Sequence, residues 1–322
     1  MTDCIAIQNL EMHFKGCDAL RGIDLTVPCG SVFALLGENG AGKTTLIRIL
    51  TGFQRPSNGT CSVLGLNPAT DSLEIRRRVG YVSDAPALYD WMQVDEIGWF
   101  ASSFYPSNYL DSFRELIARF EVPATRKIRH LSKGQRAKVA LALAIAHDPE
   151  LLILDEPTSG LDPLVRREFL ESMVERAATG RTVLLSSHQI SEVERVADQV
   201  AILHEGKVQL NATLGDLREN VCEVTFGVDD PLAAIPVLNG SAEVLSHQQK
   251  GRQVRLVVRG FDDRDHESVG GWPGVHSLRK RPATLDEIFV ACTRGISPSP
   301  AEADAMLGTF HDRVDSADRQ AS

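Results

Sequence analysis

The chain has no hydrophobic run that approaches the roughly 18 consecutive apolar residues that mark a membrane-spanning helix. One of its longest candidates, Val139–Ala146, is about half that length. The N-terminal Met1–Cys4 also lacks the basic and apolar regions of a secretory signal peptide. We therefore expect a cytoplasmic protein whose role at a membrane, if it has one, comes through a partner.

Positive charge and paired cysteines are also scarce. There are 34 Lys and Arg residues against 43 Asp and Glu, which gives a net charge of −9 and a pI of about 5.5. This balance argues against a nucleic-acid partner held by bulk positive charge. The six cysteines form no C-x-x-C pair and no metal-type cluster with the histidines, so reduced, mostly buried thiols are expected.

The remaining composition is that of a globular protein with two domains. The chain has 322 residues, of which 43% are hydrophobic and 24% charged. Strand and helix patterns alternate through residues 1–220, with a helical insertion near 85–150. We expect a small α+β domain over 221–296 and a disordered polar tail over 297–322.

The first domain carries the pattern of a largely parallel sheet. Leu151–Leu154 and Thr182–Leu185 are continuous apolar runs, typical of parallel strands that are buried on both faces. Leu164–Ala178 has helical spacing and is followed by Gly180. Such β/α alternation predicts an α/β fold.

A glycine-rich segment follows the apolar strand Ser31–Leu36 and precedes the helical segment Leu46–Leu50. It fits G-x-x-x-x-G-K-[ST] at every required position. The candidate residues for binding a nucleoside triphosphate are Gly37, Glu38, Asn39, Gly40, Ala41, Gly42, Lys43, Thr44 and Thr45. Strand, glycine turn and helix bring backbone N–H groups around phosphates. Lys43 can then reach the β- and γ-phosphates, and the Thr44 hydroxyl can ligate Mg²⁺.

Two further segments carry chemistry. Asp155 and Glu156 directly follow the strand at Leu151–Leu154; the first can hold Mg²⁺, and the second can orient or deprotonate an attacking water. Ser132 precedes a helix, whose free N–H groups can receive a phosphate. Simple capping of that helix by Ser132 is the alternative.

Taken together, these segments resemble the ATP-binding subunit of an ABC transporter over about residues 4–215. Gly37–Thr45 resembles the Walker A loop, and Leu151–Glu156 resembles Walker B with its catalytic glutamate. Leu131–Gln135 resembles the LSGGQ signature, with Lys133 in place of its first glycine. Several such motifs in the right order are far more specific than any one of them.

Three smaller matches complete the resemblance. Ser159, Gly160, Leu161 and Asp162 resemble the D-loop. His188 resembles the switch histidine that contacts the γ-phosphate, and Phe14 resembles the aromatic residue that stacks on adenine. Each of these two side chains has a structural alternative, as a hydrogen-bonded core histidine and as a core aromatic.

The resemblance implies a P-loop NTPase fold with an ABC-type nucleotide-binding domain, in which a mainly parallel core sheet, an antiparallel β subdomain and a helical subdomain combine. It implies hydrolysis of ATP to ADP and phosphate with Mg²⁺ bound by Thr44 and Asp155. It also implies a head-to-tail homodimer or heterodimer, in which Ser132, Gly134 and Gln135 of one subunit cover the ATP of the other. Separate permease subunits would hold the dimer at the inner face of the membrane.

Asp84 departs from the family pattern, which places glutamine after the Tyr81–Val82 strand. That glutamine senses Mg²⁺ and the attacking water, so Asp84 is either a further metal-site residue or an ordinary turn residue.

Pro282–Val290 resembles an ending that is common in ATPases of ABC-2 type exporters. This favours export of a drug, peptide antibiotic or lipid-like substrate. One alternative is a non-transport ABC ATPase that acts on DNA, ribosomes or cluster assembly. Another is a transporter ATPase whose C-terminal domain binds a regulator.

Overall fold

The structure is a computed structural model that describes residues 3–105, 107–230, 238 and 242–294, so the tail predicted over 297–322 lies outside the described residues. The chain divides between Leu214 and Gly215 into two compact units. Within the described part of the chain, no helix has the length and apolar character to cross a membrane. Each unit is described by itself below.

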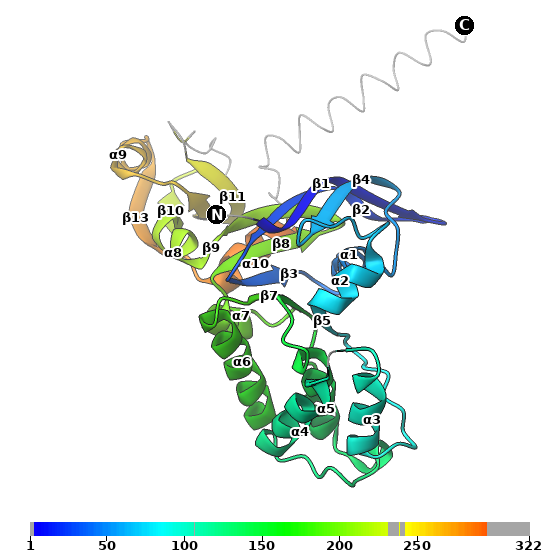
Figure 1. Cartoon of the computed structure of the whole chain (residues 1–322). Coiled ribbons are helices and arrows are strands. Elements are labelled where there is room, and N and C mark those ends of the chain that lie inside the picture. Colours follow the sequence, from blue (N-terminus) through cyan, green and yellow to red (C-terminus); the bar gives the residue numbers. More distant parts are fainter. Residues whose placement is uncertain (1–2, 106, 231–237, 239–241, 295–322) are drawn as a thin grey trace, which may run out of the picture. The chain divides into compact units, whose positions relative to one another are not determined.

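A six-stranded sheet forms the centre of the first unit (Figure 1). In spatial order its strands are β5 (Val79–Val82), β6 (Leu151–Asp155), β7 (Thr182–Ser187), β3 (Val32–Leu36), β8 (Gln199–His204) and β9 (Lys207–Thr213). The first five run parallel, and β9 pairs antiparallel with β8. Every residue of β3, β6 and β7 is buried, as their apolar runs predict. The predicted parallel sheet is confirmed.

A second, antiparallel sheet covers the helix that follows the phosphate-loop sequence. Its strands are β1 (Asp3–Phe14), β2 (Cys17–Pro28) and β4 (Asn58–Val63), with β1 in the middle. Helix α1 (Lys43–Leu50) buries Leu46, Ile47, Ile49 and Leu50 in the core that this sheet shares with the six-stranded one. This packing fixes the N-terminus of α1 at the end of β3. Helix α2 (Ser72–Arg78) leads into β5.

Three helices make up the predicted helical insertion, and in Figure 1 they lie together on the side of the six-stranded sheet away from β1, β2 and β4. They are α3 (Val94–Ser102), α4 (Tyr109–Arg119) and α5 (Lys133–Ile145), with a short 3-10 helix at Ile128–His130. Ile97, Phe113 and Val139 meet in their own apolar core. Helix α6 (Pro163–Ala178) and helix α7 (Ile190–Val196) flank β7 in the chain.

The second unit is built on a four-stranded antiparallel sheet in the order β11-β12-β10-β13. Its elements are β10 (Val221–Val228), β11 (Glu243–Lys250), β12 (Gln253–Arg259), α9 (Asp263–Gly270), β13 (Val275–Pro282) and α10 (Leu285–Arg294), after the connecting α8 (Leu214–Asn220). Alternate residues such as Val224, Phe226 and Leu256 form one apolar face. The sequence predicted two of these strands, at Cys222–Val228 and Gln253–Val258. The other two, β11 and β13, lie on either side of that pair and were not predicted.

Candidate functional site

The glycine-rich segment forms a tight loop between β3 and α1. Gly42 has φ of 111°, and a Cβ there would lie 2.7 Å from the carbonyl oxygen of Ala19. At Gly37 a Cβ would lie 2.6 Å from the carbonyl oxygen of Leu203. Both positions require glycine, for the close approach and, at Gly42, for the left-handed backbone. The loop therefore leads directly into the first free N–H groups of α1, where an anion is stabilised.

Lys43 lies inside this loop rather than in solvent. Its Nζ donates to the carbonyl oxygen of Gly37 at 2.7 Å and to that of Glu38 at 3.2 Å, and its side chain is 6% exposed. The third neighbour of Nζ is Glu156 Oε1, at 3.2 Å. The structure thus brings together two residues that the sequence assigned to phosphate binding and to water activation.

Glu156 follows β6 with an unusual backbone, since its φ is 49°. Its N–H donates to the carbonyl oxygen and to Oγ of Ser186, at 3.2 and 3.1 Å. Its second carboxylate oxygen, Oε2, lies 2.7 Å from Nδ1 of His188, whose side chain is 43% exposed. A left-handed non-glycine residue at a strand end is typical of a functional position. His188 is therefore not a buried core histidine but a partner of Glu156.

The neighbouring Asp155 is 1% exposed and accepts a 2.6 Å hydrogen bond from Ser186 Oγ. Thr44 lies at the start of α1 with its side chain exposed to the pocket. Carboxylate and hydroxyl oxygens are the ligand types that Mg²⁺ takes beside phosphates. The residues present fit that ion. Among the described residues there is no group of three or more His, Cys, Asp or Glu arranged to hold a metal by protein ligands alone.

A pocket of about 550 Å³ opens above the loop. Its lining includes the loop residues from Glu38 to Thr45 and also Phe14, Asp84 and Glu156. Phe14 ends β1 and is 46% exposed, so the alternative of a core aromatic is excluded. The sequence did not point to the other lining residues: Cys17, Asp18, Ala19, Arg21, Glu205 and Gly206. A pocket of this size, with an exposed ring at its edge, can hold a nucleotide.

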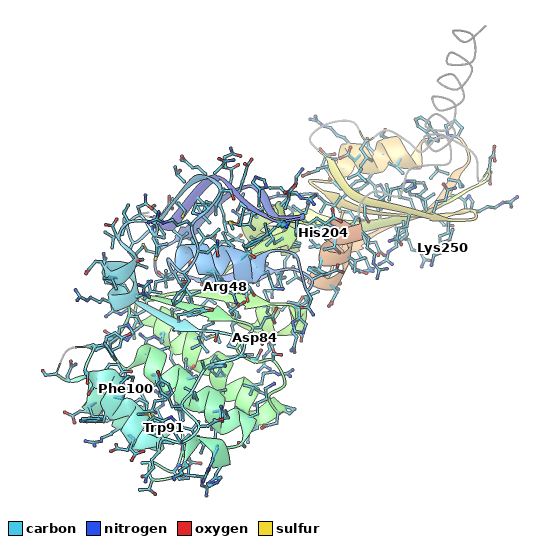
Figure 2. The ribbon with its side chains drawn as sticks, turned by 90° about the vertical axis from the view of Figure 1, so that its right-hand side faces the viewer. Arg48, Asp84, Trp91, Phe100, His204 and Lys250 are labelled. Atoms are coloured by element: carbon cyan, nitrogen blue, oxygen red, sulfur yellow. The ribbon has the colours of Figure 1, made fainter. Side chains whose placement is uncertain are left out.

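Asp84 lies just beyond β5, between the six-stranded sheet and the helical insertion (Figure 2). It is exposed, and it lines the nucleotide-sized pocket. Tyr81 reports on its surroundings: burial raises the pKa of the Tyr81 phenol, and the charges of Asp155 and Asp84 add to that increase. Asp84, which stands where the family has glutamine, therefore lies near Asp155 and Glu156.

The signature residues do not line this pocket. Ser132 caps α5, since its Oγ accepts from the Gln135 N–H at 3.2 Å and its own N–H donates to Gln135 Oε1 at 3.1 Å. Gly134 is buried against Val165. The predicted capping of α5 by Ser132 is thus present, and the signature residues lie outside the pocket above the phosphate loop.

The D-loop connects Glu156 with helix α6. Ser159 N–H donates to the Glu156 carbonyl oxygen at 3.1 Å, and Asp162 caps α6 by accepting from Leu164 and Val165 N–H groups at 3.1 and 3.0 Å. Gly160 has φ of 67°, and a Cβ there would collide with the ammonium group of Lys133.

A buried polar network behind the D-loop was missed at the level of sequence. Glu192, 3% exposed, accepts from Thr158 Oγ1 at 2.7 Å and from Ser187 Oγ at 3.4 Å. Its other oxygen lies 3.2 Å from Nε of Arg166. These contacts tie Thr158 and Arg166, on either side of the D-loop, to the segment that carries His188. The only sequence signal is a Glu four residues after the histidine, which is too weak to assign alone.

Comparisons with known proteins find relatives in sequence and in fold. A family model described as ABC transporter matches residues 20–159. An uncharacterized ABC transporter ATP-binding protein of Nostoc sp. is 40% identical over 206 residues, which cover 62% of this chain and 61% of that protein. The Nod factor export ATP-binding protein I of Burkholderia lata is 35% identical over 298 residues, 90% of this chain and 96% of that protein.

A solved structure of the ATP-binding subunit of an ABC transporter is also similar. It has a TM-score of 0.63 and 32% sequence identity, and the match covers 67% of this chain and 92% of that one. The residues matched by the family model, 20–159, include the phosphate loop and the two acidic residues after β6. The chain therefore belongs to the family of ABC transporter ATP-binding proteins.

Proposed function

We propose that this chain binds and hydrolyses ATP with Mg²⁺ to drive export of a drug, a peptide antibiotic or a lipid-like molecule through separate permease subunits. The similarity to the Nod factor export protein extends over 90% of the chain, so it includes the C-terminal unit as well as the ATP-binding part. The similarity to the Nostoc protein covers only 62%. The longer match favours a role in export, because the Nod factor export protein matches this chain over both of its units.

The phosphate loop supplies the binding half of the mechanism. Lys43 and the backbone N–H groups at the start of α1 bind the phosphates, while Phe14 stacks on the adenine. Thr44 and Asp155 would hold Mg²⁺, which would neutralise charge on the phosphate oxygens. Charge stabilisation and positioning, rather than covalent chemistry, lower the barrier.

Glu156 supplies the catalytic half. Its carboxylate lies between Lys43 and His188, so it can orient the attacking water or accept its proton. His188 is exposed enough to contact the γ-phosphate. In a head-to-tail dimer, Ser132, Gly134 and Gln135 of the second subunit would cover the same phosphate, and the D-loop would carry the change at Glu156 into the dimer interface.

The observation that carries the transport role is an aromatic surface on the helical insertion. The side chains of Trp91, Trp99 and Phe104 are 65%, 62% and 66% exposed. Trp91 and Phe100 are labelled in Figure 2, on the part of the first unit that contains α3. Ring contacts join Trp91 to Tyr89, Tyr89 to Phe100 and Phe100 to Phe104, with centroids 6.1, 5.9 and 5.6 Å apart. Exposed aromatic side chains of this kind mark protein or membrane contacts.

Beside this surface lies a cavity of about 370 Å³ between α3, α5 and β5. Its lining includes Tyr89, Phe100 and Phe104 and also Ser83, the residue before Asp84. A permease segment bound in this cavity would lie close to Asp84, which lines the nucleotide-sized pocket. This arrangement supports coupling between ATP turnover and a membrane partner.

A fractionation experiment in the source cells tests the proposal. Wild-type protein and a Trp99→Ser/Phe104→Ser variant are compared for recovery with washed membranes and for ATPase activity. We expect wild type to co-purify with a multi-span permease, and the variant to lose the membranes while keeping basal ATPase activity. Leu73→Ser, which changes a side chain 72% exposed on α2, is the matched control.

Two results would contradict the transport role. The first is wild-type protein that is absent from washed membranes. The second is co-purification with ribosomes or a DNA-repair complex, which would support the non-transport alternative.

A further inference from the structure

The four-stranded sheet of the C-terminal unit has an uneven distribution of charge on the face opposite its apolar core. At one end of this face, Glu223 of β10 and Glu287 of α10 meet Arg255 and Arg281. The Arg255–Glu287 and Arg281–Glu223 distances are 2.6 and 2.9 Å. Two carboxylates and two guanidinium groups thus neutralise each other there.

At the other end of the same strands, cations gather without carboxylates. A pocket of about 510 Å³ is lined by Thr225, Phe226, Gly227, Lys250, Arg252, Gln253, His276, Ser277 and Arg279. No acidic residue is in that lining. Figure 2 labels Lys250 on the sheet of this unit. Among the described residues, no ion pair involves Lys250, Arg252 or Arg279.

The strand pairing gathers these cations. Thr225 of β10 pairs with Arg279 of β13, and Gly227 pairs with His276, so one extra residue bulges out of β13 between them. Ser277, within that bulge, has φ of 58°. The His276 ring lies against Gly227, where a Cβ would collide with it. A bulge re-aims side chains, and strained backbone in a strand points to a functional constraint.

One acidic side chain approaches the edge of this group without lining it. Asp229 Oδ1 lies 3.7 Å from His276 Nδ1, and its side chain is 79% exposed. Asp229 can neutralise at most one of the positive charges in this group. Lys250, Arg252 and Arg279 keep their charges for a ligand.

We propose that this pocket is a second anion site, separate from the phosphate loop, that binds a ligand carrying a phosphate or diphosphate group. Arg252 and Arg279 offer planar donor groups that match phosphate oxygens in pairs, and Lys250 adds a point charge. The Thr225 and Ser277 hydroxyls add neutral donors. The volume is within the range of small-ligand pockets and exceeds what one phosphate needs, which leaves room for a further part of the ligand.

Calorimetric titration of the full-length chain with inorganic pyrophosphate tests the site. Lys43→Ala is the common background, because it weakens binding at the phosphate loop. We expect Arg252→Gln/Arg279→Gln in this background to weaken pyrophosphate binding by about tenfold or more, since two charge-assisted contacts are lost. Arg264→Gln, an exposed arginine on α9 of the same unit, should leave it unchanged.

The same proteins are sedimented with phosphatidylcholine vesicles with and without phosphatidylglycerol, which separates a lipid headgroup from a soluble ligand as the source of the phosphate. Loss of binding in the double variant but not in Arg264→Gln supports the site in either arm. If the double variant melts at a lower temperature than the background, Lys250→Ala replaces it, with a smaller loss expected. Equal binding by the pocket variant and the control in both arms overturns the proposal, as does the absence of binding by the background protein in both.

Discussion

Nδ1 of His188 lies 2.7 Å from Oε2 of Glu156, while the other oxygen of that carboxylate, Oε1, lies 3.2 Å from Nζ of Lys43. The three residues follow β7, β6 and β3, which are adjacent in the sheet. The carboxyl ends of parallel strands meet at one edge, so residues far apart in sequence become neighbours there. Glu156 therefore links the phosphate-loop lysine to the histidine.

Replacement of Lys43 by alanine removes the cation at the centre of the loop. We expect ATP binding to weaken roughly 10- to 100-fold, because a charge-assisted contact with phosphate is lost, and hydrolysis to stop. Calorimetry with ATP and a steady-state phosphate assay measure both. Unchanged affinity together with an unchanged rate would exclude this loop as the phosphate site.

Ser186→Ala tests a residue that has no motif of its own. Its Oγ donates to buried Asp155 and accepts from the N–H of Glu156. We expect the free energy of unfolding to fall by about 1–3 kcal/mol, because a buried carboxylate loses a donor. Thermal denaturation measures this. Ser172→Ala on α6 is the control, because that hydroxyl donates only to the carbonyl oxygen of Phe169 in the same helix. A Ser186→Ala protein as stable as the control would show that Asp155 does not need this donor.

Asp84 is predicted to act on the metal. Its charged, shorter side chain lines the pocket in place of glutamine, so we expect Asp84→Ala to shift the Mg²⁺ dependence of ATPase activity to higher concentration. Asp84→Gln should restore a family-like response and keep turnover. Superimposable Mg²⁺ titrations for wild type and Asp84→Ala would leave Asp84 as a turn residue.

The C-terminal sheet is predicted to lose stability in acid. A hydrogen bond from Arg281 is the main cause that lowers the pKa of Glu287 from 4.5 to about 2. A carboxyl whose pKa is lower in the folded state stabilises the fold above its unfolded pKa, and this contribution disappears as the pH falls from about 4.5 to about 2.

The test compares wild type with Glu287→Gln. The melting temperature of wild type should exceed that of the variant near neutral pH, and the difference should shrink as the pH falls through that interval. A difference that stays constant with pH would show that the Glu287 charge does not contribute to stability.

Sequence patterns predicted the strands that are buried on both faces, but they did not predict β11 and β13, the two edge strands of the C-terminal sheet. Leu151–Leu154 is a continuous apolar run inside β6, and its burial follows directly. β13, in contrast, contains Arg279, Lys280 and Arg281 and is largely exposed. β13 forms because its backbone pairs with β10, whereas its own composition does not favour a strand. Helix α9 was missed because it is polar, although Asp262 and Asp265 form a capping box at its N-terminus, each accepting a hydrogen bond from the backbone N–H of the other.

The candidate site shows the same division. Continuous motifs identified Lys43, Asp155 and Glu156, since spacing along the chain defines them. The contacts of Glu192 and Ser186 depend on the packing of β6 against β7, which no local pattern contains. The basic pocket of β10, β12 and β13 likewise forms only when the strands pair.

The most direct test of the account is turnover by Glu156→Gln. The amide keeps the size of the side chain but cannot accept a proton from water, so we predict normal ATP binding and nearly abolished phosphate release. With ATP and Mg²⁺, size-exclusion chromatography should show a trapped dimer of the variant. Turnover by Glu156→Gln at the wild-type rate would contradict the assignment of Glu156 as the residue that activates water.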